Sequence, residues 1–400
     1  MMKLLIMRTI CLLVLLTSGS AMAQDSSSAP TFPKLGGPYA VGTAEFEISD
    51  PERKDLYYDS ERKIPVKVWY PAEEVELPRE TYLKDEDFLK EMIAQGYNHQ
   101  DSSALRQMAS FRVNSVTGAP IKGKERFPLI LFSHGLGVSK INYSLFAEAF
   151  ASQGYITVMI DHPYGGFTRT KEGRLMSSRQ DTLLNSEKMD SMLVVRANEW
   201  IQDLHTLLDQ ILADDTAIGR AFSRHIDQTR IISMGHSLGG NVALQYPATD
   251  SRVIAAVNLD GGSFGSLTGP PQVPSLTLRS QPVYTDEELQ AKGRNREDWN
   301  AMGKEIDAVF SAALTGSEAA YEIKIKQAGH MSFSDAPYVL PDMITRFGGK
   351  ILSPGDSFQV IKEAILVFLR ATFQGEQPEF QHYLQDCTHC EFKAYEKREE

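Results

Sequence analysis

The sequence predicts an α/β protein whose central sheet is mainly parallel and covered by helices on both faces. Two short, continuous apolar runs, residues 127–132 and 155–160, are typical of strands buried on both faces. Between such runs lie amphipathic stretches, of which residues 191–212 are the longest, with apolar side chains along one helical stripe. Because strands that alternate with helices pair in parallel, we expect one layered sheet.

The other predicted elements follow the same alternation. Strands are expected at residues 64–70, 230–234, 253–259, 275–278 and 321–325. Helices are expected at residues 85–94, 103–111, 142–153, 241–246, 302–314 and 358–373, and several are followed by a glycine that can end a helix. The series predicts a single domain.

Composition excludes several classes of protein. With 42% hydrophobic and 23% charged residues, the 400-residue chain can build a full core and is not a disordered protein. Its formal net charge of -11 disfavours nucleic acid and anionic lipid as electrostatic partners. Three cysteines cannot form a disulfide framework.

The first residues have the plan of a secretory signal peptide. Lys3 and Arg8 precede a short apolar run at residues 9–16, and Ala21 and Ala23 occupy the small-residue positions of a cleavage site. A short membrane anchor is the less favoured alternative, because the apolar run cannot span a bilayer. We therefore expect residues 1–23 to be removed from an exported, periplasmic or secreted protein, with residues 24–39 as a flexible leader.

Residues 235–240 read Gly-His-Ser-Leu-Gly-Gly and match the G-x-S-x-G motif of a nucleophile elbow. The motif requires a serine on a tight turn between a strand and a helix, which is the predicted context of Ser237. A second match surrounds Ser263, but Pro270 and Pro271 follow it and prevent a helix there. Ser237 is therefore the predicted nucleophile, and Ser263 is expected to be a loop serine.

A serine nucleophile needs a base, which an acid usually orients. In the elbow order, the acid and then the histidine follow the serine. His330 comes directly after a late predicted strand, whereas the other two downstream histidines lie near the end of the chain. Asp260, at the end of the strand at residues 253–259, is the predicted acid, and Asp286 is its rival.

Acyl transfer also needs two N–H donors for the oxyanion. One is expected from Leu238, which follows the nucleophile, and the other from Leu136, with Gly135 as the alternative. We interpret His134 as a structural residue more readily than as a second base. Four residues are candidates for the substrate pocket: His134, Gly135, His162 and His236.

These blocks resemble the α/β-hydrolase superfamily and, within it, the plasma-type platelet-activating factor acetylhydrolases. The resemblance rests on residues 127–162, on the elbow at residues 235–240, and on the short interval of 23 residues (260 − 237) from Ser237 to Asp260. Dienelactone hydrolase-like proteins and bacterial lipases or polyester hydrolases share much of this pattern. The resemblance implies hydrolysis of short or oxidised acyl chains from phospholipids, without a metal or other cofactor.

The expected domain organisation follows. Residues 40–375 are the predicted catalytic domain, with insertions near residues 77–122 and 163–188 that roof the pocket. Residues 376–400 are a predicted polar C-terminal tail. In this tail Cys387 and Cys390 are expected to form a local disulfide rather than free thiols, because the contexts of a redox motif and of a zinc site are missing.

The sequence thus predicts a serine ester hydrolase that acts on a small-molecule or lipid ester. General carboxylesterases, lipases, polyester hydrolases and peptidases are the enzymatic alternatives, and a binding protein on an inactive hydrolase scaffold is the non-enzymatic one. After loss of Lys3 and Arg8 the net charge becomes −13 (−11 − 2), so any transient membrane contact should use an apolar patch. The sequence leaves the oligomeric state open.

Overall fold

The computed structural model describes residues 29–97, 100–178, 189–263, 270–317, 319–345 and 351–395. The predicted signal peptide, residues 1–23, lies outside the described residues, as does the start of the predicted leader.

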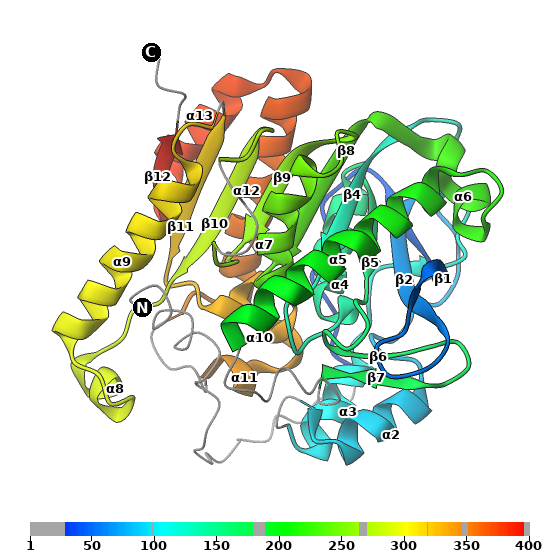
Figure 1. Cartoon of the computed structure of the whole chain (residues 1–400), viewed down its shortest axis with the longest axis horizontal. Helices are drawn as coiled ribbons and strands as arrows, with labels where there is room; N and C mark the ends of the chain where they lie inside the picture. The colour runs from blue at the N-terminus through cyan, green and yellow to red at the C-terminus, as the bar shows by residue number, and fades with distance from the viewer. Residues whose placement is uncertain are drawn as a thin grey trace.

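A ten-stranded sheet forms the centre of the described part, in the order β12-β11-β10-β9-β8-β4-β5-β2-β1-β3 (Figure 1). The strands from β5 to β11 in this order are parallel to their neighbours, and antiparallel pairing begins at β2 and β12 on the two sides. The strand bounds are β1 Ala40–Lys54, β2 Glu61–Ala72, β3 Val116–Thr117, β4 Phe127–Ser133, β5 Ile156–Ile160, β8 Ile226–His236, β9 Val253–Leu259, β10 Ser275–Gln281, β11 Ala320–Lys326 and β12 Cys390–Tyr395. This confirms the predicted α/β class with a mainly parallel sheet.

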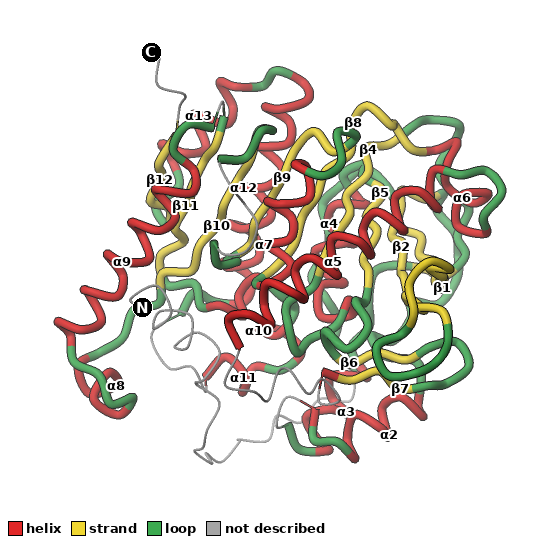
Figure 2. Tube along the Cα trace, in the orientation of Figure 1, coloured by secondary structure: helices red, strands yellow, loops and turns green. Residues whose placement is uncertain are grey.

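Helices cover both faces of the sheet (Figure 2). In β4, Leu129 and Leu131 pack toward α5 (Met189–Leu212), α6 (Ala217–Phe222) and α7 (Leu238–Gln245). The alternate residues Ile130 and Phe132 pack toward α4 (Ser144–Ser152) and α12 (Pro354–Gln374) on the other face. Alternating side chains of one strand point to opposite faces, so a strand between two helical layers must be apolar throughout.

The remaining helices have the bounds α2 Glu86–Ala94, α3 Ser102–Ser110, α8 Asp286–Ala291, α9 Arg296–Leu314, α10 Ala336–Val339, α11 Pro341–Thr345 and α13 Gln377–Asp386. Short 3-10 helices are η2 Lys140–Tyr143, η4 Ser223–His225, η5 Tyr246–Ala248 and η6 His330–Phe333. Among the described residues no helix is both long and apolar enough to cross a bilayer.

The two segments predicted as insertions pack on each other. The first contains α2 and α3, and the second contains a hairpin of β6 (Phe167–Arg169) and β7 (Leu175–Ser177). The ring of Phe167 lies 5.5 Å from the rings of both Phe88 and Tyr97. Figure 1 places α2, α3, β6 and β7 below the sheet, on the side where α10 and α11 also lie.

The predicted flexible leader is wrong for the part of it that the structure describes. Thr31 forms a β-bridge with Arg112, and Phe32 is only 3% exposed. The Phe32 ring packs against Tyr82 at 5.5 Å and Phe111 at 5.8 Å, both in the first insertion. A composition rich in Ser, Pro and Gly hides this single aromatic anchor, because its partners come later in the chain.

The predicted polar tail is also integrated into the fold. Helix α13 packs against α12, with Phe380 1% exposed, and β12 pairs antiparallel with β11 at the edge of the sheet. A disulfide joins Cys387 to Cys390 between α13 and β12. The tail is polar because an edge strand and a surface helix each bury few side chains, and not because the segment is solvated throughout.

Candidate active site

Ser237 lies at the turn between β8 and α7, with φ 55° and ψ −120°. A non-glycine residue in this region carries backbone strain, which is common at functional sites. The turn is held because the Ser237 N–H donates to the Leu259 carbonyl at 2.9 Å. It also depends on glycine, because a Cβ on Gly240 would lie 2.1 Å from Asn258 Oδ1 and one on Gly239 would lie 2.2 Å from the Ser133 carbonyl oxygen.

Asp260 and His330, separated by 70 residues in the chain, meet beside this turn. His330 Nδ1 lies 2.7 Å from Asp260 Oδ2, so Nδ1 carries the proton and Nε2 can accept one. Asp260 is itself fixed, because it accepts the Ser280 N–H and the Ser280 hydroxyl, each at 2.7 Å. Burial would raise the pKa of Asp260, but the hydrogen bond and charge of His330, together with Ser280, outweigh burial and lower the pKa to about 2.

The rival residues lie elsewhere. Asp286 is the first residue of α8, its side chain is 67% exposed, and it pairs with Arg296 at 2.8 Å. Ser263 lies in the loop after Asp260, and residues 264–269, which include the end of its motif, are outside the described residues. The geometry therefore joins His330 to Asp260 and not to Asp286.

The backbone N–H groups of Leu136 and Leu238 have no hydrogen-bond acceptor among the described residues, and neither do those of Gly239 and Gly240 further along the first turn of α7. Leu238 is the first residue of α7, where an N–H has no partner within the helix. Leu136 follows Gly135, which touches the nucleophile, since a Cβ on Gly135 would lie 3.2 Å from Ser237 Cβ. The Gly135 N–H, the alternative donor, is occupied because it donates to the Tyr143 hydroxyl at 2.9 Å.

The three histidines predicted to line the pocket lie beneath the site, and this corrects the prediction. His134, His162 and His236 are each at most 1% exposed. Burial lowers the pKa of His162 to about 4, and burial with the charge of His330 lowers the pKa of His236 to about 3. These residues are neutral, hydrogen-bonded parts of the framework and do not form an open surface for substrate.

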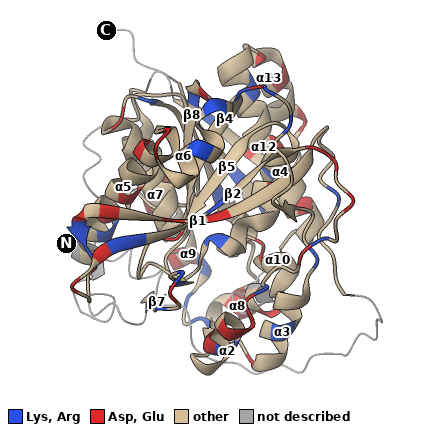
Figure 3. Cartoon of the chain, turned by 90° about the vertical axis from the view of Figure 1, so that its right-hand side faces the viewer, with Lys and Arg blue, Asp and Glu red and all other residues tan. Residues whose placement is uncertain are grey.

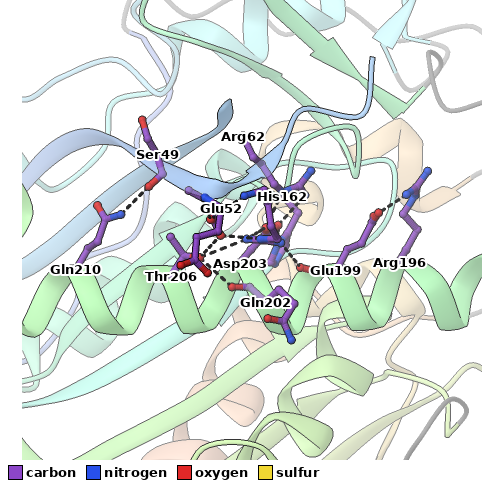
Figure 4. Close-up of polar contacts among 12 residues, drawn as sticks. Ser49, Glu52, Arg62, His162, Arg196, Glu199, Gln202, Asp203, Thr206 and Gln210 are labelled. Atoms are coloured by element: carbon purple, nitrogen blue, oxygen red, sulfur yellow. Dashed lines mark hydrogen bonds and ion pairs between the residues drawn. The ribbon is translucent and has the colours of Figure 1, made fainter. Parts of the chain in front are cut away.

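His162 belongs to a buried polar cluster between α5 and the strands β2 and β4 (Figure 4). Its Nδ1 lies 2.9 Å from Asp203 Oδ2, its Nε2 lies 3.0 Å from Ser133 Oγ, and its ring stacks on Trp200 at 4.2 Å. Arg62 donates to both Asp203 oxygens, at 2.7 and 2.8 Å. Burial would raise the pKa of Asp203, but the charge of Arg62 outweighs it and keeps the carboxylate ionised.

Sequence reasoning missed Tyr143, Ser280 and Asp203. The only sequence signal for Asp203 is a charged residue among the apolar positions of α5, where Trp200 and Leu204 are fully buried. Tyr143 and Ser280 have no local signal, because each acts through a contact with a distant segment. Within the described residues no group of three or more His, Cys, Asp or Glu side chains is arranged to hold a metal ion.

Comparison with known proteins identifies relatives that match most of the chain. The model of the family "Platelet-activating factor acetylhydrolase, isoform II" matches residues 24–388. A protein of Arthroderma benhamiae named "Probable 1-alkyl-2-acetylglycerophosphocholine esterase" is 25% identical over 350 residues, which cover 83% of this chain and 82% of that protein. The platelet-activating factor acetylhydrolase of Gallus gallus is 24% identical, and the match covers 84% of this chain and 82% of that protein. That of Cavia porcellus is 26% identical, but the match covers 58% of this chain and 56% of that protein.

Among solved structures, the ferulic acid esterase from Streptomyces cinnamoneus superimposes with a TM-score of 0.66 at 23% identity. The match covers 87% of this chain and 94% of that protein, and it shows a shared fold. The sheet order, the strand–turn–helix at Ser237 and the family match agree. The chain belongs to the platelet-activating factor acetylhydrolase, isoform II family and is a carboxylic-ester hydrolase with an α/β-hydrolase fold.

Proposed function

We propose that this protein is an exported serine esterase that releases a short acyl group from a phospholipid-like ester through an acyl-enzyme. The observation that carries the proposal is the pairing of His330 with Asp260 at 2.7 Å beside the strained Ser237 turn. Nucleophile, base and orienting acid are the three parts that this chemistry needs.

In the first half of the reaction, His330 Nε2 takes the Ser237 hydroxyl proton while Ser237 Oγ attacks the carbonyl carbon. The negative charge that forms on the carbonyl oxygen is stabilised by the Leu136 and Leu238 N–H groups. The bond from carbon to the alcohol oxygen then breaks, and His330 donates its proton to the leaving alcohol. The product is an ester between Ser237 and the acyl group.

In the second half, His330 takes a proton from water and the resulting hydroxide adds to the acyl carbon. The bond to Ser237 Oγ breaks, the proton returns to Ser237, and the carboxylic acid leaves. Asp260 stays ionised throughout, because its pKa of about 2 lies far below neutral pH. It holds the imidazole in one tautomer and stabilises the imidazolium that forms in both halves.

The relatives support the substrate class. Those named above are called acetylhydrolases or an acetylglycerophosphocholine esterase, and a family match over residues 24–388 includes the whole site. A general carboxylesterase, lipase or polyester hydrolase is the second candidate, favoured by the fold shared with a ferulic acid esterase. A short acyl chain on a phospholipid is therefore the first substrate to test.

The decisive experiment compares hydrolysis rates of 2-acetyl and long-chain phosphatidylcholines, a triglyceride, a polyester film and p-nitrophenyl acetate, with wild type and Ser237→Ala. We expect the 2-acetyl phospholipid to be cleaved fastest per enzyme and Ser237→Ala to be inactive on all substrates. Preference for the triglyceride or polyester would favour the second candidate. Absence of labelling by a fluorophosphonate would instead identify an inactive scaffold.

Export is tested by the N-terminus of the mature protein. Cleavage after Ala23 predicts a periplasmic or secreted protein that begins at Gln24, which N-terminal sequencing reads directly. A cytoplasmic protein that retains Met1 would contradict this part of the proposal.

For lipid contact we propose the turn between β1 and β2, where Leu56, Tyr57 and Tyr58 are 38, 39 and 44% exposed. Acidic and basic residues are both present along β1 beside this turn (Figure 3). We therefore do not expect anionic lipid to be preferred over zwitterionic lipid. Aromatic rings of Tyr suit the interface of a zwitterionic bilayer. A Tyr57→Ser/Tyr58→Ser variant should float less with phosphatidylcholine vesicles at unchanged turnover of p-nitrophenyl acetate; equal flotation would refute the contact.

A further inference from the structure

The Leu136 N–H belongs to the Gly135–Leu136 peptide, and hydrogen bonds hold both this peptide and the one before it. The Gly135 N–H donates to the Tyr143 hydroxyl at 2.9 Å, and the Gly135 carbonyl lies 2.7 Å from His134 Nδ1. His134 Nε2 accepts the His162 N–H at 3.1 Å, so Nδ1 carries the proton and donates to Gly135. In a trans peptide the C=O and the following N–H point in opposite directions. Fixing the Gly135 carbonyl therefore aims the Leu136 N–H away from His134.

The Tyr143 hydroxyl continues into a second fixed chain. Because it accepts from Gly135, its own proton is directed to His236 Nδ1, 2.8 Å away. His236 Nε2 lies 2.9 Å from the His330 carbonyl oxygen, which can only accept, so Nε2 carries the proton of this ring. One consistent set of donors and acceptors thus links Gly135, Tyr143, His236 and the backbone of His330.

These contacts are close as well as directed. A Cβ on Gly135 would lie 3.1 Å from His236 Nδ1, 3.2 Å from the Tyr143 hydroxyl oxygen and 3.2 Å from Ser237 Cβ. Tyr143 is fully buried, and burial raises the pKa of its hydroxyl above the ordinary range, so it stays a neutral donor.

We propose that Tyr143 is a positioning residue for the oxyanion hole: its hydroxyl holds the Gly135 N–H, in the peptide that directly precedes the Gly135–Leu136 peptide, and, through His236, ties this turn to the loop that carries His330. This inference rests on the proposed esterase mechanism. It assigns the x residue of the G-x-S-x-G motif, His236, to the link between the two halves of the site. Neither residue touches the substrate.

Removing the hydroxyl predicts a specific defect. In Tyr143→Phe the Gly135 N–H becomes a buried donor without an acceptor, which favours reorientation of the loop. Loss of a whole oxyanion donor lowers kcat by about 10² to 10³. Because Leu136 would be misplaced and not removed, we expect kcat to fall by about 10- to 100-fold, with KM changed by less than about threefold.

The control is Tyr246→Phe. Tyr246 is also fully buried, and its hydroxyl donates to Asp250 at 3.1 Å at the far end of α7, away from Ser237. Turnover of p-nitrophenyl acetate, the melting temperature and the affinity for a trifluoromethyl ketone are measured for both variants. The ketone forms a tetrahedral oxyanion on Ser237, so its affinity should fall with kcat in Tyr143→Phe and stay at the wild-type value in Tyr246→Phe.

Two results would overturn the inference: a Tyr143→Phe enzyme within threefold of wild-type kcat, or equal losses in both variants. If Tyr143→Phe does not fold, the pair His236→Gln and His236→Leu replaces it. Gln can accept from Tyr143 and donate to the His330 carbonyl, so the kcat of His236→Gln should be at least tenfold higher than that of His236→Leu. Equal rates would contradict a role for these hydrogen bonds in catalysis. Full turnover by Ser237→Ala would refute the esterase mechanism itself, whereas an inactive Ser237→Ala with a fully active Tyr143→Phe refutes only this inference.

Discussion

Among the described residues there are two Ser–His–Asp sets, and only one has the surroundings of an active site. The first set is Ser237, His330 and Asp260, and the second is Ser133, His162 and Asp203. In both sets the histidine Nδ1 lies within hydrogen-bond distance of the carboxylate, at 2.7 Å in the first and 2.9 Å in the second. The second set even has the Ser–His hydrogen bond, at 3.0 Å.

The difference lies in burial, backbone and charge. All three side chains of the second set are completely buried, whereas the His330 side chain is 28% exposed. Ser133 ends an extended strand, while Ser237 is on a turn with φ 55° beside the Leu136 and Leu238 N–H groups, which lack acceptors among the described residues. Arg62 and Arg53 form ion pairs with Asp203, whereas Asp260 is held by hydrogen bonds from His330 and Ser280. Hydrogen bonds of the right kind therefore do not make a nucleophile unless substrate and oxyanion donors can reach it.

The largest expected effect contrasts the two serines. Ser237→Ala should lower kcat by about 10⁵-fold, because the nucleophile is lost and only binding and the oxyanion donors remain. Ser133→Ala should change kcat by less than about tenfold, since its hydroxyl only donates to His162. Steady-state rates on p-nitrophenyl acetate measure both effects. Comparable losses of kcat in the two variants would contradict the assignment of different roles to the two serines.

The two aspartates should separate catalysis from stability. Asp260→Asn should lower kcat by about 10³- to 10⁴-fold, because the imidazole loses its orienting charge. Asp203→Asn leaves the Arg62 charge buried without its partner and should lower the free energy of unfolding by about 3 to 5 kcal/mol. Urea unfolding and kcat per folded enzyme distinguish the effects; a stable Asp203→Asn protein would show that the buried pair is dispensable.

A smaller effect is expected on the free energy of unfolding as the pH is lowered. The pKa of His162 is lowered to about 4 and that of His236 to about 3, against about 6.5 in an unfolded chain. The unfolded state binds these protons first, so their stabilisation is complete above pH 6.5 and is lost as the pH falls toward 4. Each should contribute a slope of up to about 1.4 kcal/mol per pH unit. The stabilisation by Asp260, whose pKa is lowered to about 2, is complete above about pH 4 and is lost only as the pH falls toward 2.

Urea unfolding at pH 7.5, 6.0 and 5.0 measures this slope. His162→Gln and His236→Gln should each reduce the slope of the free energy of unfolding against pH, between pH 6 and 5, by the contribution of about one proton. A wild-type free energy of unfolding that is constant from pH 7.5 to 5.0 would mean that the buried histidines are not neutral as inferred.

Local sequence patterns predicted much of the fold and most of the candidate site. Apolar runs located β4, β5 and β9, and the order of motif, acid and histidine singled out the residues that the structure brings together. Strand β1 was missed because charged residues interrupt its alternation, and β12 was missed because an edge strand buries only Tyr395 strongly. The burial of Phe32 could not be predicted from its neighbours in the sequence, because it depends on contacts with the first insertion.

The sequence by itself determined the α/β class and predicted the kind of chemistry, from a serine in a glycine-rich turn after a buried strand, followed by an acid and one suitable histidine. Tertiary structure alone decided which of two Ser–His–Asp sets is open to solvent, and which N–H groups near Ser237 are free. The physical reason is that burial and hydrogen-bond partners are set by residues far apart in the chain. Tyr143 meets His236 across 93 residues, and His330 meets Asp260 across 70.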